Sequence, residues 1–410
     1  GLESVRRRSE RFVKPFPDLF QCSRGCGGAR RIGPVCSVTS LEGTDIGFYP
    51  IGNVPDPHLR GAYLGLCFAG MVLSKFSTLA FLAGSLLFCA FIFWRRNQRD
   101  AKPLVASRLR ALLPPLGLAA GLAFFLVWAA YRFTFGPAPY FPFPVPFPEL
   151  FEGLEQVVQH NEKGHLSYFL GSTGMSGSWL FFPTLIAVKT PLAVLVLAAA
   201  ALVLKVKRCA GWPDWILWAV IAGVLGVAMA ARINIGLRHV LPLMPFLSVA
   251  AASGALALWE RRARSRLAGD GAATCLLLLF LSSAAAHPDY LPFFNLLAGD
   301  HPEKIAVDSD LDWGQDIKRL GSRLQELGVQ QVAFTPLIVS DLNLLGFPPR
   351  VAVDPLQPLP GYNAVSLTQL KLDRLYLPAG QPSLKPWPEG IEPAERIGKT
   401  ILLYYFKQGP

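Results

Sequence analysis

The stretch RINIGLRHVLPLMPFL, residues 232–247, sets positive charge directly against an apolar run. The polar side chains at its start are Arg232, Asn234, Arg238 and His239. Arginine carries a planar fork of donors that matches phosphate oxygens, and a charge at the edge of an apolar phase is costly unless it is paired. These residues therefore predict a site for a lipid phosphate. In the alternative, Arg232 and Arg238 only snorkel to lipid headgroups, and Pro242 and Pro245 only kink the helix.

The composition places these residues in a polytopic α-helical membrane protein. Of the 410 residues, 52% are hydrophobic and 16% are charged, whereas soluble proteins carry about a quarter charged residues. A helix needs roughly 20 apolar residues to cross a hydrocarbon core about 30 Å thick. We expect such spans at 112–133, 185–204, 215–231, 240–259 and 272–286. The longer window 64–94, interrupted by Ser74, Lys75 and Ser77, is either one tilted helix or two short ones.

The positive charge is distributed as expected for a membrane protein. The net charge of +11 would suit nucleic acid if the chain were soluble. Lys and Arg gather instead in three short loops, at 95–110, 205–208 and 261–266. Because basic loops stay in the cytoplasm, these loops are predicted to be cytoplasmic. The segments 135–184 and 232–239 and the tail from His287 onward then lie outside, and we expect no nucleic-acid partner.

Three regions follow from this pattern. Residues 1–60 are polar, irregular and basic, begin with Gly1 and lack the apolar run of a signal peptide. Residues 61–286 form the helical membrane domain, and 287–410 an extracytoplasmic α/β domain. The seven cysteines form no even framework. Cys22, Cys26 and Cys36 lack the paired spacing of a zinc site, so zinc is the less favoured interpretation.

Two segments outside the spans have readable local patterns. Prolines alternate from Pro137 to Pro148 and favour an extended path, whereas 149–160 has the spacing of an amphipathic interfacial helix. In the tail, the pattern predicts a strand at 305–307, a helix at 314–327 and a strand at 331–335. This order indicates a parallel β-α-β unit.

Other candidate residues face the same outer compartment. Lys189 lies near the outer start of a span and either adds a cation to the phosphate site or snorkels. His165 and Tyr168 line an acceptor groove, unless Tyr168 belongs to an interfacial aromatic belt. The stretch DSDLDWGQD resembles a calcium loop, but Gly314 is one place late and Arg319 replaces the bidentate Glu. A strand end followed by an Asp helix cap is preferred, and the candidates for sugar or acceptor contact are Asp312, Trp313 and Gln315.

A resemblance rests on five pieces in order: GHLSYFLG, SWLFFPTLIAVKTPLAVL, INIGLRHVLPLMPFL, HPDYLPFFNLLAGD and DSDLDWGQDIKRL. Together they resemble the second half of bacterial membrane glycosyltransferases of the protein O-mannosyltransferase type, in the GT-C class (family 39-like, phospholipid carrier-dependent). The likeness covers roughly residues 61–406. It implies a multi-pass enzyme of the inner membrane that moves a sugar from a polyprenyl-phosphate carrier, with inversion, at the outer face.

The resemblance also implies carboxylates in early outer loops, and here the chain departs from the family. The first acidic loop is expected before Gly1, so the sequence is interpreted as N-terminally truncated or disturbed. SLEGTDIGF resembles a later Thr-Thr-Asp element, which makes Asp45 the one acidic position carried over. Such a carboxylate takes a proton from the acceptor or holds a divalent cation, while Arg232, Arg238 and His239 steady the departing phosphate. Asp45 is equally well a turn residue.

Two other classes of function stay open. A transporter predicts internal repeats and discontinuous helices with polar residues at mid-membrane. A non-catalytic membrane protein would use its outer domain to bind a partner. We find no repeat, and the polar cluster lies at one face. The glycosyltransferase is therefore preferred, with membrane lipid and a polyprenyl-phosphate sugar as partners, an acceptor of unknown identity and no metal ligands assigned.

Overall fold

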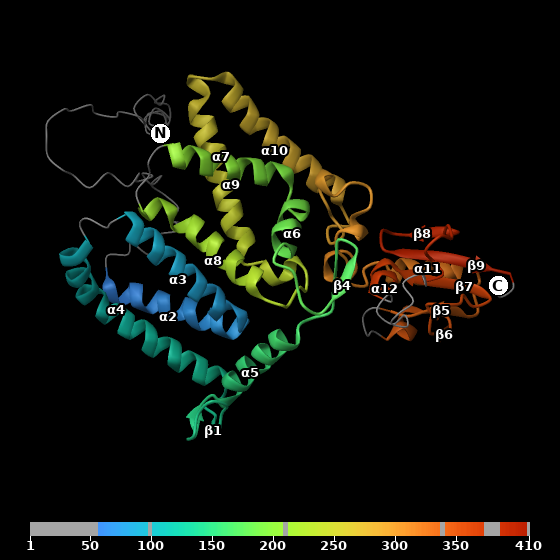
Figure 1. Ribbon diagram of the computed structural model, residues 1–410, viewed down its shortest axis with the longest axis horizontal. Coiled ribbons are helices and arrows are strands. Elements are labelled where there is room, and N and C mark those ends of the chain that lie inside the picture. Colours follow the sequence, from blue (N-terminus) through green and yellow to red (C-terminus); the bar gives the residue numbers. More distant parts are fainter. Residues whose placement is uncertain (1–55, 97–100, 208–211, 337–340, 373–385, 408–410) are drawn as a thin grey trace, which may run out of the picture. The chain divides into compact units, whose positions relative to one another are not determined.

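The computed structural model describes residues 56–96, 101–207, 212–336, 341–372 and 386–407. Asp45, Cys22, Cys26 and Cys36 lie outside these residues. Residues Val54–Pro410 form one compact unit by their contacts. In this unit long helices come first along the chain and the main sheet comes last (Figure 1).

The helical part is built from long apolar helices joined by short turns. Its helices are α2 (Pro57–Ser74), α3 (Ser77–Arg96), α4 (Ala101–Ala130), α6 (Phe181–Lys189), α7 (Leu192–Lys207), α8 (Ile216–Ala230), α9 (Leu243–Trp259) and α10 (Arg266–Ala286). Within the described residues, five windows are long and apolar enough to cross a membrane: Ser77–Arg95, Leu112–Ala130, Pro213–Ala230, Leu243–Ala263 and Arg266–Ala286. The expected spans at 112–133, 215–231, 240–259 and 272–286 each overlap one of these windows.

The window 64–94 consists of two helices. α2 ends at Ser74, and α3 begins at Ser77 and runs back (Figure 1). α2 runs parallel to α4, since Gly61 faces Pro115 and Gly65 faces Ala119. The approach is close: a Cβ on Gly61 would lie 2.5 Å from the carbonyl oxygen of Pro115. Lys75 therefore lies at the end of the bundle where α4 finishes, opposite the end where α2 begins.

The span expected at 185–204 is not one continuous helix, because the chain bends by 112° between α6 and α7. The bend lies at Thr190 and Pro191. A residue before proline is pushed out of the helical region, and Thr190 is accordingly extended, with ψ 135°. If the bent pair is one span, the candidate spans of the described chain rise to six.

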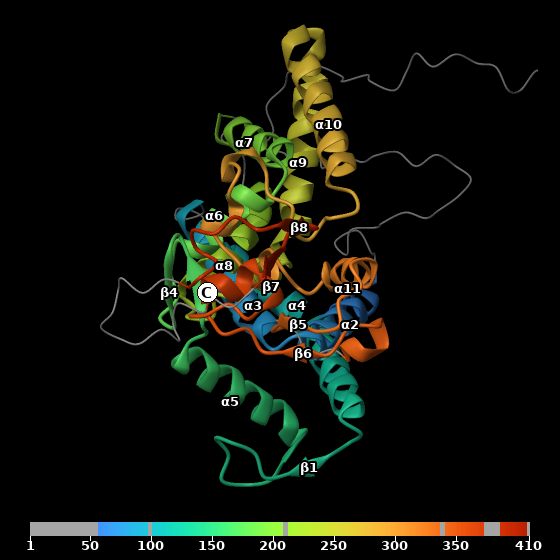
Figure 2. The same ribbon diagram turned by 90° about the vertical axis from the view of Figure 1, so that its right-hand side faces the viewer.

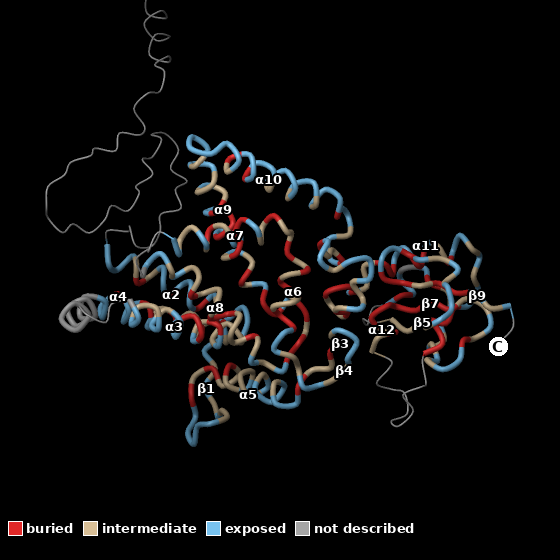
Figure 3. Tube along the Cα trace, turned by 45° about the horizontal axis from the view of Figure 1, so that its top comes forward, coloured by how far each residue is buried: buried red, intermediate tan, exposed pale blue. Residues whose placement is uncertain are grey.

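The helices pack through an apolar core at the Arg238 end. Phe182, Leu185, Val240 and Leu243 are almost wholly buried there. α9 and α10 lie side by side (Figures 1 and 2) and are joined by η4 (Glu260–Ala263). The outward surface of α10 is exposed along most of its length (Figure 3), and it carries large apolar residues such as Phe280. This apolar outer surface has no protein covering in the described structure.

The segment between α4 and α6 follows the expected pattern. β1 (Phe135–Gly136) pairs antiparallel with β2 (Val145–Pro146), and no helix forms across the intervening prolines. α5 (Pro148–Lys163) confirms the amphipathic helix expected at 149–160 and buries Leu150. A hairpin of β3 (Ser167–Phe169) and β4 (Ser172–Gly174) follows.

The C-terminal part holds a five-stranded mixed sheet. Its order is β6 (Arg350–Val351), β5 (Val332–Phe334), β7 (Gly361–Ser366), β9 (Ile401–Phe406) and β8 (Glu395–Ile397). β5 pairs parallel with β6 and β7, whereas β9 is antiparallel to β7 and β8. α11 (Ile317–Glu326) buries Ile317, Leu320 and Leu324 in the core beside the sheet. The short α12 (Leu367–Leu372) follows β7.

The predicted β-α-β unit was right for its helix and second strand and wrong for its first. The residues at 305–307 make no strand of the sheet; Ala306 forms a single bridge to Phe169 of β3 instead. The backbone turns at once into a 3₁₀ turn, η7 (Asp308–Asp310), and Asp308 takes a left-handed φ of 59°. This turn ends the extended backbone directly after Val307. The pattern of apolar residues alone did not reveal this turn.

Candidate functional site

The RINIGLRH turn and the DSDLDWGQD loop meet in the structure. The Asp310 carboxylate accepts a hydrogen bond from the Leu237 backbone N–H at 2.9 Å, and the Ser309 hydroxyl donates to the Ile235 carbonyl at 2.8 Å. Gly236 allows this contact, because it has φ 88° and a Cβ on it would lie 2.6 Å from the Ser309 hydroxyl. Two sequence motifs therefore form one site at the start of α9.

Arg238 lies at the centre of this site on η3 (Leu237–Val240). Its Nε donates to the Ile235 carbonyl at 3.0 Å, and its guanidinium carbon lies 4.4 Å from the centre of the Trp313 ring. Among the described residues, the structure shows no hydrogen bond or ion pair at its two terminal nitrogens. The side chain is thus held by a carbonyl and an aromatic face while most of its donor fork stays free.

Other titratable groups lie near Arg238, and its positive charge shifts their pKa values. Partial burial and the Arg238 charge lower the pKa of Lys75, which lies between α2 and α3. Burial, His160 and Arg238 lower the pKa of His165. The sequence singled out His165 but not Lys75. Lys75 appeared only as an interruption in an apolar window, because its position at this end depends on where α2 turns.

His239 is buried between aromatic rings and is uncharged at neutral pH. Its ring lies 5.5 Å from both the Phe182 and Phe81 rings, and its Nδ1 has no hydrogen-bond partner in the residues that the structure describes. Burial, with Lys75 and Arg238 nearby, lowers its pKa to about 4. His239 therefore offers a neutral donor or acceptor rather than the cation that the sequence suggested.

Asp308 and Asp310 bring two carboxylates to the site. One oxygen of each, Oδ2, is buried and has no hydrogen-bond partner among the described residues. Burial raises the pKa of Asp308, and it raises the pKa of Asp310 to about 6, while Arg238 opposes both shifts. The sequence contained these residues only as part of a rejected calcium loop. Their alternation before Trp313 was the available signal, but it did not reveal contact with Arg238.

Asn234 lies nearby, beside a separate cavity. The residue is 2% exposed, and within the described part of the chain neither its amide oxygen nor its nitrogen has a hydrogen-bond partner. It lines a cavity of about 320 Å³ formed with the β3–β4 hairpin, including Ser167 and Thr173. A buried unpaired amide at a cavity wall can bind a polar ligand group such as a hydroxyl.

Lys189 and Arg232 make contacts that do not include Arg238. The Lys189 ammonium donates to the carbonyls of Leu291 and Asp310 and lies 4.6 Å from the Phe294 ring centre. Arg232 donates from its guanidinium to the Glu162 carbonyl at the end of α5, at 3.5 Å. Lys189 thus ties α6 to the tail, and Arg232 contacts the last turn of α5.

The remaining predicted residues support the loop from inside. Tyr168 is 5% exposed and packs against Val307 and Leu311, so it is no part of an interfacial belt. Asp312 accepts from the Ser366 hydroxyl at 2.5 Å and from the Gly314 N–H at 2.9 Å. The Gln315 amide oxygen accepts a hydrogen bond from the Trp313 N–H, and its amide nitrogen donates one to the Leu311 carbonyl, both at 2.8 Å. Among these tail residues, Trp313 is the one that faces Arg238.

The expected Asp cap on the tail helix was wrong. Asp316 precedes α11 but forms no side-chain cap bond. Its buried carboxylate accepts instead from the backbone N–H groups of Lys399 and Thr400, at 2.9 and 3.0 Å. The turn between β8 and β9 thus binds this carboxylate in place of the start of α11. Because that turn is far away in the sequence, the local pattern did not reveal this contact.

No metal centre emerges from the described residues. Among them no group of three or more His, Cys, Asp or Glu side chains could hold a metal ion. Asp308 and Asp310 supply two carboxylates, and Mg²⁺ is usually bound by one or two carboxylates when waters and substrate phosphates complete its coordination shell.

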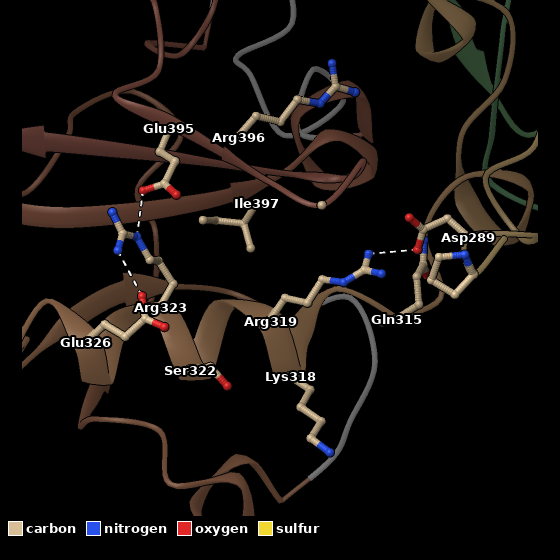
Figure 4. Close-up of a pocket in the computed structure, with 12 residues that line it drawn as sticks. Asp289, Gln315, Lys318, Arg319, Ser322, Arg323, Glu326, Glu395, Arg396 and Ile397 are labelled. Carbon is tan, nitrogen blue, oxygen red and sulfur yellow. Dashed lines mark hydrogen bonds and ion pairs between the residues drawn. The ribbon is translucent and has the colours of Figure 1, made fainter. Parts of the chain in front are cut away.

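A second groove lies on the tail beside α11, with a volume of about 650 Å³. Figure 4 shows that two of its arginines are already paired. Arg319 forms an ion pair with Asp289 at 2.7 Å, and Arg323 contacts Glu395 at 2.8 Å and Glu326 at 2.9 Å. Arg319 and Arg323 are therefore already neutralised by carboxylates, unlike the terminal nitrogens of Arg238.

Comparisons of the chain with protein-family models, with curated proteins and with solved structures found no match.

Proposed function

We propose that this chain is a multi-pass membrane glycosyltransferase that moves a sugar from a polyprenyl-phosphate carrier to an acceptor at the outer membrane face. One observation carries the proposal: the free donor fork of Arg238 lies beside two buried carboxylates where apolar helices end. A lipid-linked phosphate needs an apolar path for its chain and a cationic end for its head. The ordered motifs that resemble protein O-mannosyltransferases support the same function.

The membrane setting is supported by the outward surface of the helices. Large apolar side chains such as Leu277 and Phe280 on α10 are more than half exposed, and lipid would cover them. Lys205 and Lys207 lie in the last turn of α7 and the basic loop at 261–266 follows α9, whereas the Arg238 turn precedes α9. Positive loops stay in the cytoplasm, so the Arg238 site faces outward, in agreement with a bacterial inner-membrane location.

The chemistry follows from the groups that are free. Arg238, assisted by Lys75, neutralises the phosphate as the bond between the sugar carbon and the phosphate oxygen breaks. Asp308, whose pKa is raised by burial, takes the proton from the attacking acceptor hydroxyl. The acceptor oxygen forms the new bond to the sugar carbon, and the carrier phosphate leaves with the electron pair.

The positions of the sugar and acceptor can be proposed from the remaining free groups. Trp313 is 43% exposed although Arg238 lies against its ring. Its other face is suited to an apolar sugar face. The unpaired amide of Asn234, beside a cavity of about 320 Å³, is suited to hydroxyl groups of the acceptor. Asp45 lies outside the described residues and has no part in this mechanism.

The test compares two Arg–Trp pairs. Arg238→Ala should weaken binding of a polyprenyl phosphate to the purified protein by about 10- to 100-fold, the usual effect of losing hydrogen bonds to a charged group. Arg262→Ala is the control, because Arg262 lies 4.9 Å from the Trp259 ring centre at the opposite end of α9. Arg238→Lys should restore part of the binding, since it returns the charge without the fork. Equal losses in Arg238→Ala and Arg262→Ala would reject the phosphate site.

The transporter alternative has one feature in its favour, since α6 and α7 form a discontinuous helix. In transporters such breaks lie near mid-membrane and expose polar groups to substrate. Here Lys189 beside the break is bonded to carbonyls of Leu291 and Asp310, at the same end as Arg238. Sugar transfer in detergent, where no gradient exists, would favour the enzyme over the transporter.

A further inference from the structure

Another cavity, of about 610 Å³, lies beside the Arg238 site and is lined by different residues. The start of α7, the last turns of α10, the loop at 291–302 and the β8–β9 turn enclose it. We call it the α7–α10 groove. Its wall residues include Leu192, Leu278, Ala285 and Phe293, and Arg396 and Lys399 complete the lining. The groove thus has an apolar wall and a cationic edge.

The apolar wall continues onto the outward surface of α10. Leu278, which lines the groove, is 54% exposed, and the neighbouring Leu277 is 57% exposed. Leu296 lines the groove from the loop and is 89% exposed. α10 is one of the windows able to span a membrane. A lipid chain can therefore enter the groove sideways from the apolar phase around α10.

The cationic edge is held in place by the tail. Arg396 donates to the Lys399 carbonyl at 2.6 Å, and the Lys399 N–H donates to the Asp316 carboxylate at 2.9 Å. These bonds fix the turn between β8 and β9, while the Lys399 ammonium has no partner in the described structure. Asp300 is the one carboxylate among the lining residues, so two cations outnumber it at this edge.

We propose that the α7–α10 groove binds an anionic membrane phospholipid, with an acyl chain against α7 and α10 and its phosphate on Arg396 and Lys399. Charge complementarity selects this occupant, because an apolar wall ending in two basic side chains matches a chain ending in a phosphate. A zwitterionic lipid such as phosphatidylcholine also carries a phosphate, but its choline cation is repelled by the two basic side chains. The site would fasten the tail to the lipid surface.

The groove is separate from the proposed catalytic site. Phe294 lines the groove, and Lys189 lies against its ring, between the groove and Asp310. A lipid in the groove would meet Phe294, whereas Arg238 is not among the lining residues. The inference does not depend on sugar transfer, since it concerns different cations and can hold for a protein with no such activity.

The test measures lipid affinity by native mass spectrometry of the full chain in a nonionic detergent. Phosphatidylglycerol is compared with phosphatidylcholine of the same acyl chains. Each basic residue beside an anionic headgroup contributes about fivefold to affinity, so the pair should give phosphatidylglycerol an advantage of about 30-fold. Equal affinities for the two lipids would overturn the proposal.

Two pairs of variants locate the site. The double variant R396A/K399A should lose most of the preference for phosphatidylglycerol, whereas R264A/R266A, which removes the same charge from a basic loop at the opposite end of α10, should keep it. Ala285→Trp should fill the groove and weaken both lipids, whereas Leu277→Trp on the same helix should not. If each control variant changes lipid affinity as much as the groove variant it is paired with, lipid binds to the protein surface in general and not to the groove.

Discussion

The guanidinium of Arg238 lies 4.4 Å from the centre of the Trp313 ring, although one residue precedes a long apolar helix and the other belongs to the C-terminal part. Two hydrogen bonds accompany this contact, from the Leu237 N–H to the Asp310 carboxylate and from the Ser309 hydroxyl to the Ile235 carbonyl. We call the three contacts together the joint between the turn and the loop. The turn takes part in these hydrogen bonds through its main chain, at Leu237 and Ile235. The bonds therefore fix the backbone that carries the Arg238 side chain. The C-terminal part is thus a wall of the site and not merely an appendage to it.

Trp313→Ala should lower the efficiency of sugar transfer by about tenfold, since an exposed cation–π contact contributes roughly 0.5–1 kcal/mol and the sugar would lose a stacking face. Trp313→Phe should keep most of the activity. The measurement is kcat/KM with a polyprenyl-phosphate sugar. Trp259→Ala removes the equivalent Arg262 contact at the other end of α9 and should leave the rate unchanged. A similar loss in both variants would mean that stability, and not the site, is affected.

Asp308→Asn should reduce the transfer rate by about 100-fold or more, because a general base contributes about 10²–10⁴-fold to rate. Phosphate binding should be unchanged or tighter, as a negative charge beside Arg238 is removed. Burial raises the pKa of Asp308, so the wild-type rate should fall with falling pH above the ordinary carboxyl range. Asp341→Asn is a matched control, because Asp341 only caps a short turn through the Asn343 N–H. Full activity in Asp308→Asn would remove Asp308 from the mechanism.

The local pattern was sufficient for the helices and for parts of the tail. Runs of apolar residues located α4, α8, α9 and α10, and period and length located α5 and α11. The bend at Thr190 and Pro191 was missed, because residues 185–204 were expected to form one continuous span. Turn geometry at Asp308 and the destination of the Asp316 carboxylate depend on groups far along the chain.

The sequence predicted the Arg238 turn and the Trp313 loop as separate candidate sites, but it did not predict that they lie in contact. Arg238 and Trp313 were both singled out, but on separate grounds and for separate ligands. Lys75, Asp308 and Asp310 gain their interest from being near Arg238, and nearness across a fold is a tertiary property. Lys189 and Tyr168 show the converse, since their residue types suited a ligand site but the fold uses them for internal contacts.

Asp310 should make the protein less stable as the pH rises from about 4 to about 7. Burial raises its pKa from 3.8 to about 6, so the unfolded chain releases this proton before the folded chain does. In that window the folded state binds more protons and loses stability with rising pH. A shift of two units corresponds to at most about 3 kcal/mol.

Asp310→Asn should therefore flatten the pH dependence of the unfolding temperature between pH 4.5 and pH 7, while its side-chain oxygen can still accept from the Leu237 N–H. The comparison is made on the difference between wild type and variant, because carboxylates other than Asp308, whose charge acts on Asp310, contribute equally to both. An unchanged slope in the variant would show that Asp310 does not titrate as its burial indicates.

Gly236→Ala should separate the two halves of the site. Gly236 has φ 88°, and an added Cβ would lie 2.6 Å from the Ser309 hydroxyl and 2.8 Å from the Asp310 carboxylate. Backbone strain at such a position costs about 1–3 kcal/mol, and relief by moving the Asp310 loop would carry Trp313 away from Arg238. We expect a lower unfolding temperature together with weaker phosphate binding.

Gly271→Ala is the matched control, because Gly271 lies inside α10 with nothing within 4 Å of an added Cβ. Alanine is favoured over glycine in a helix by up to about 1 kcal/mol, so this variant should be as stable as wild type or more so, with phosphate binding unchanged. Were Gly236→Ala to keep full phosphate affinity, the joint between the turn and the loop would not be what holds Arg238 in place. The free donor fork would then depend only on the bond from Arg238 to the Ile235 carbonyl within its own turn.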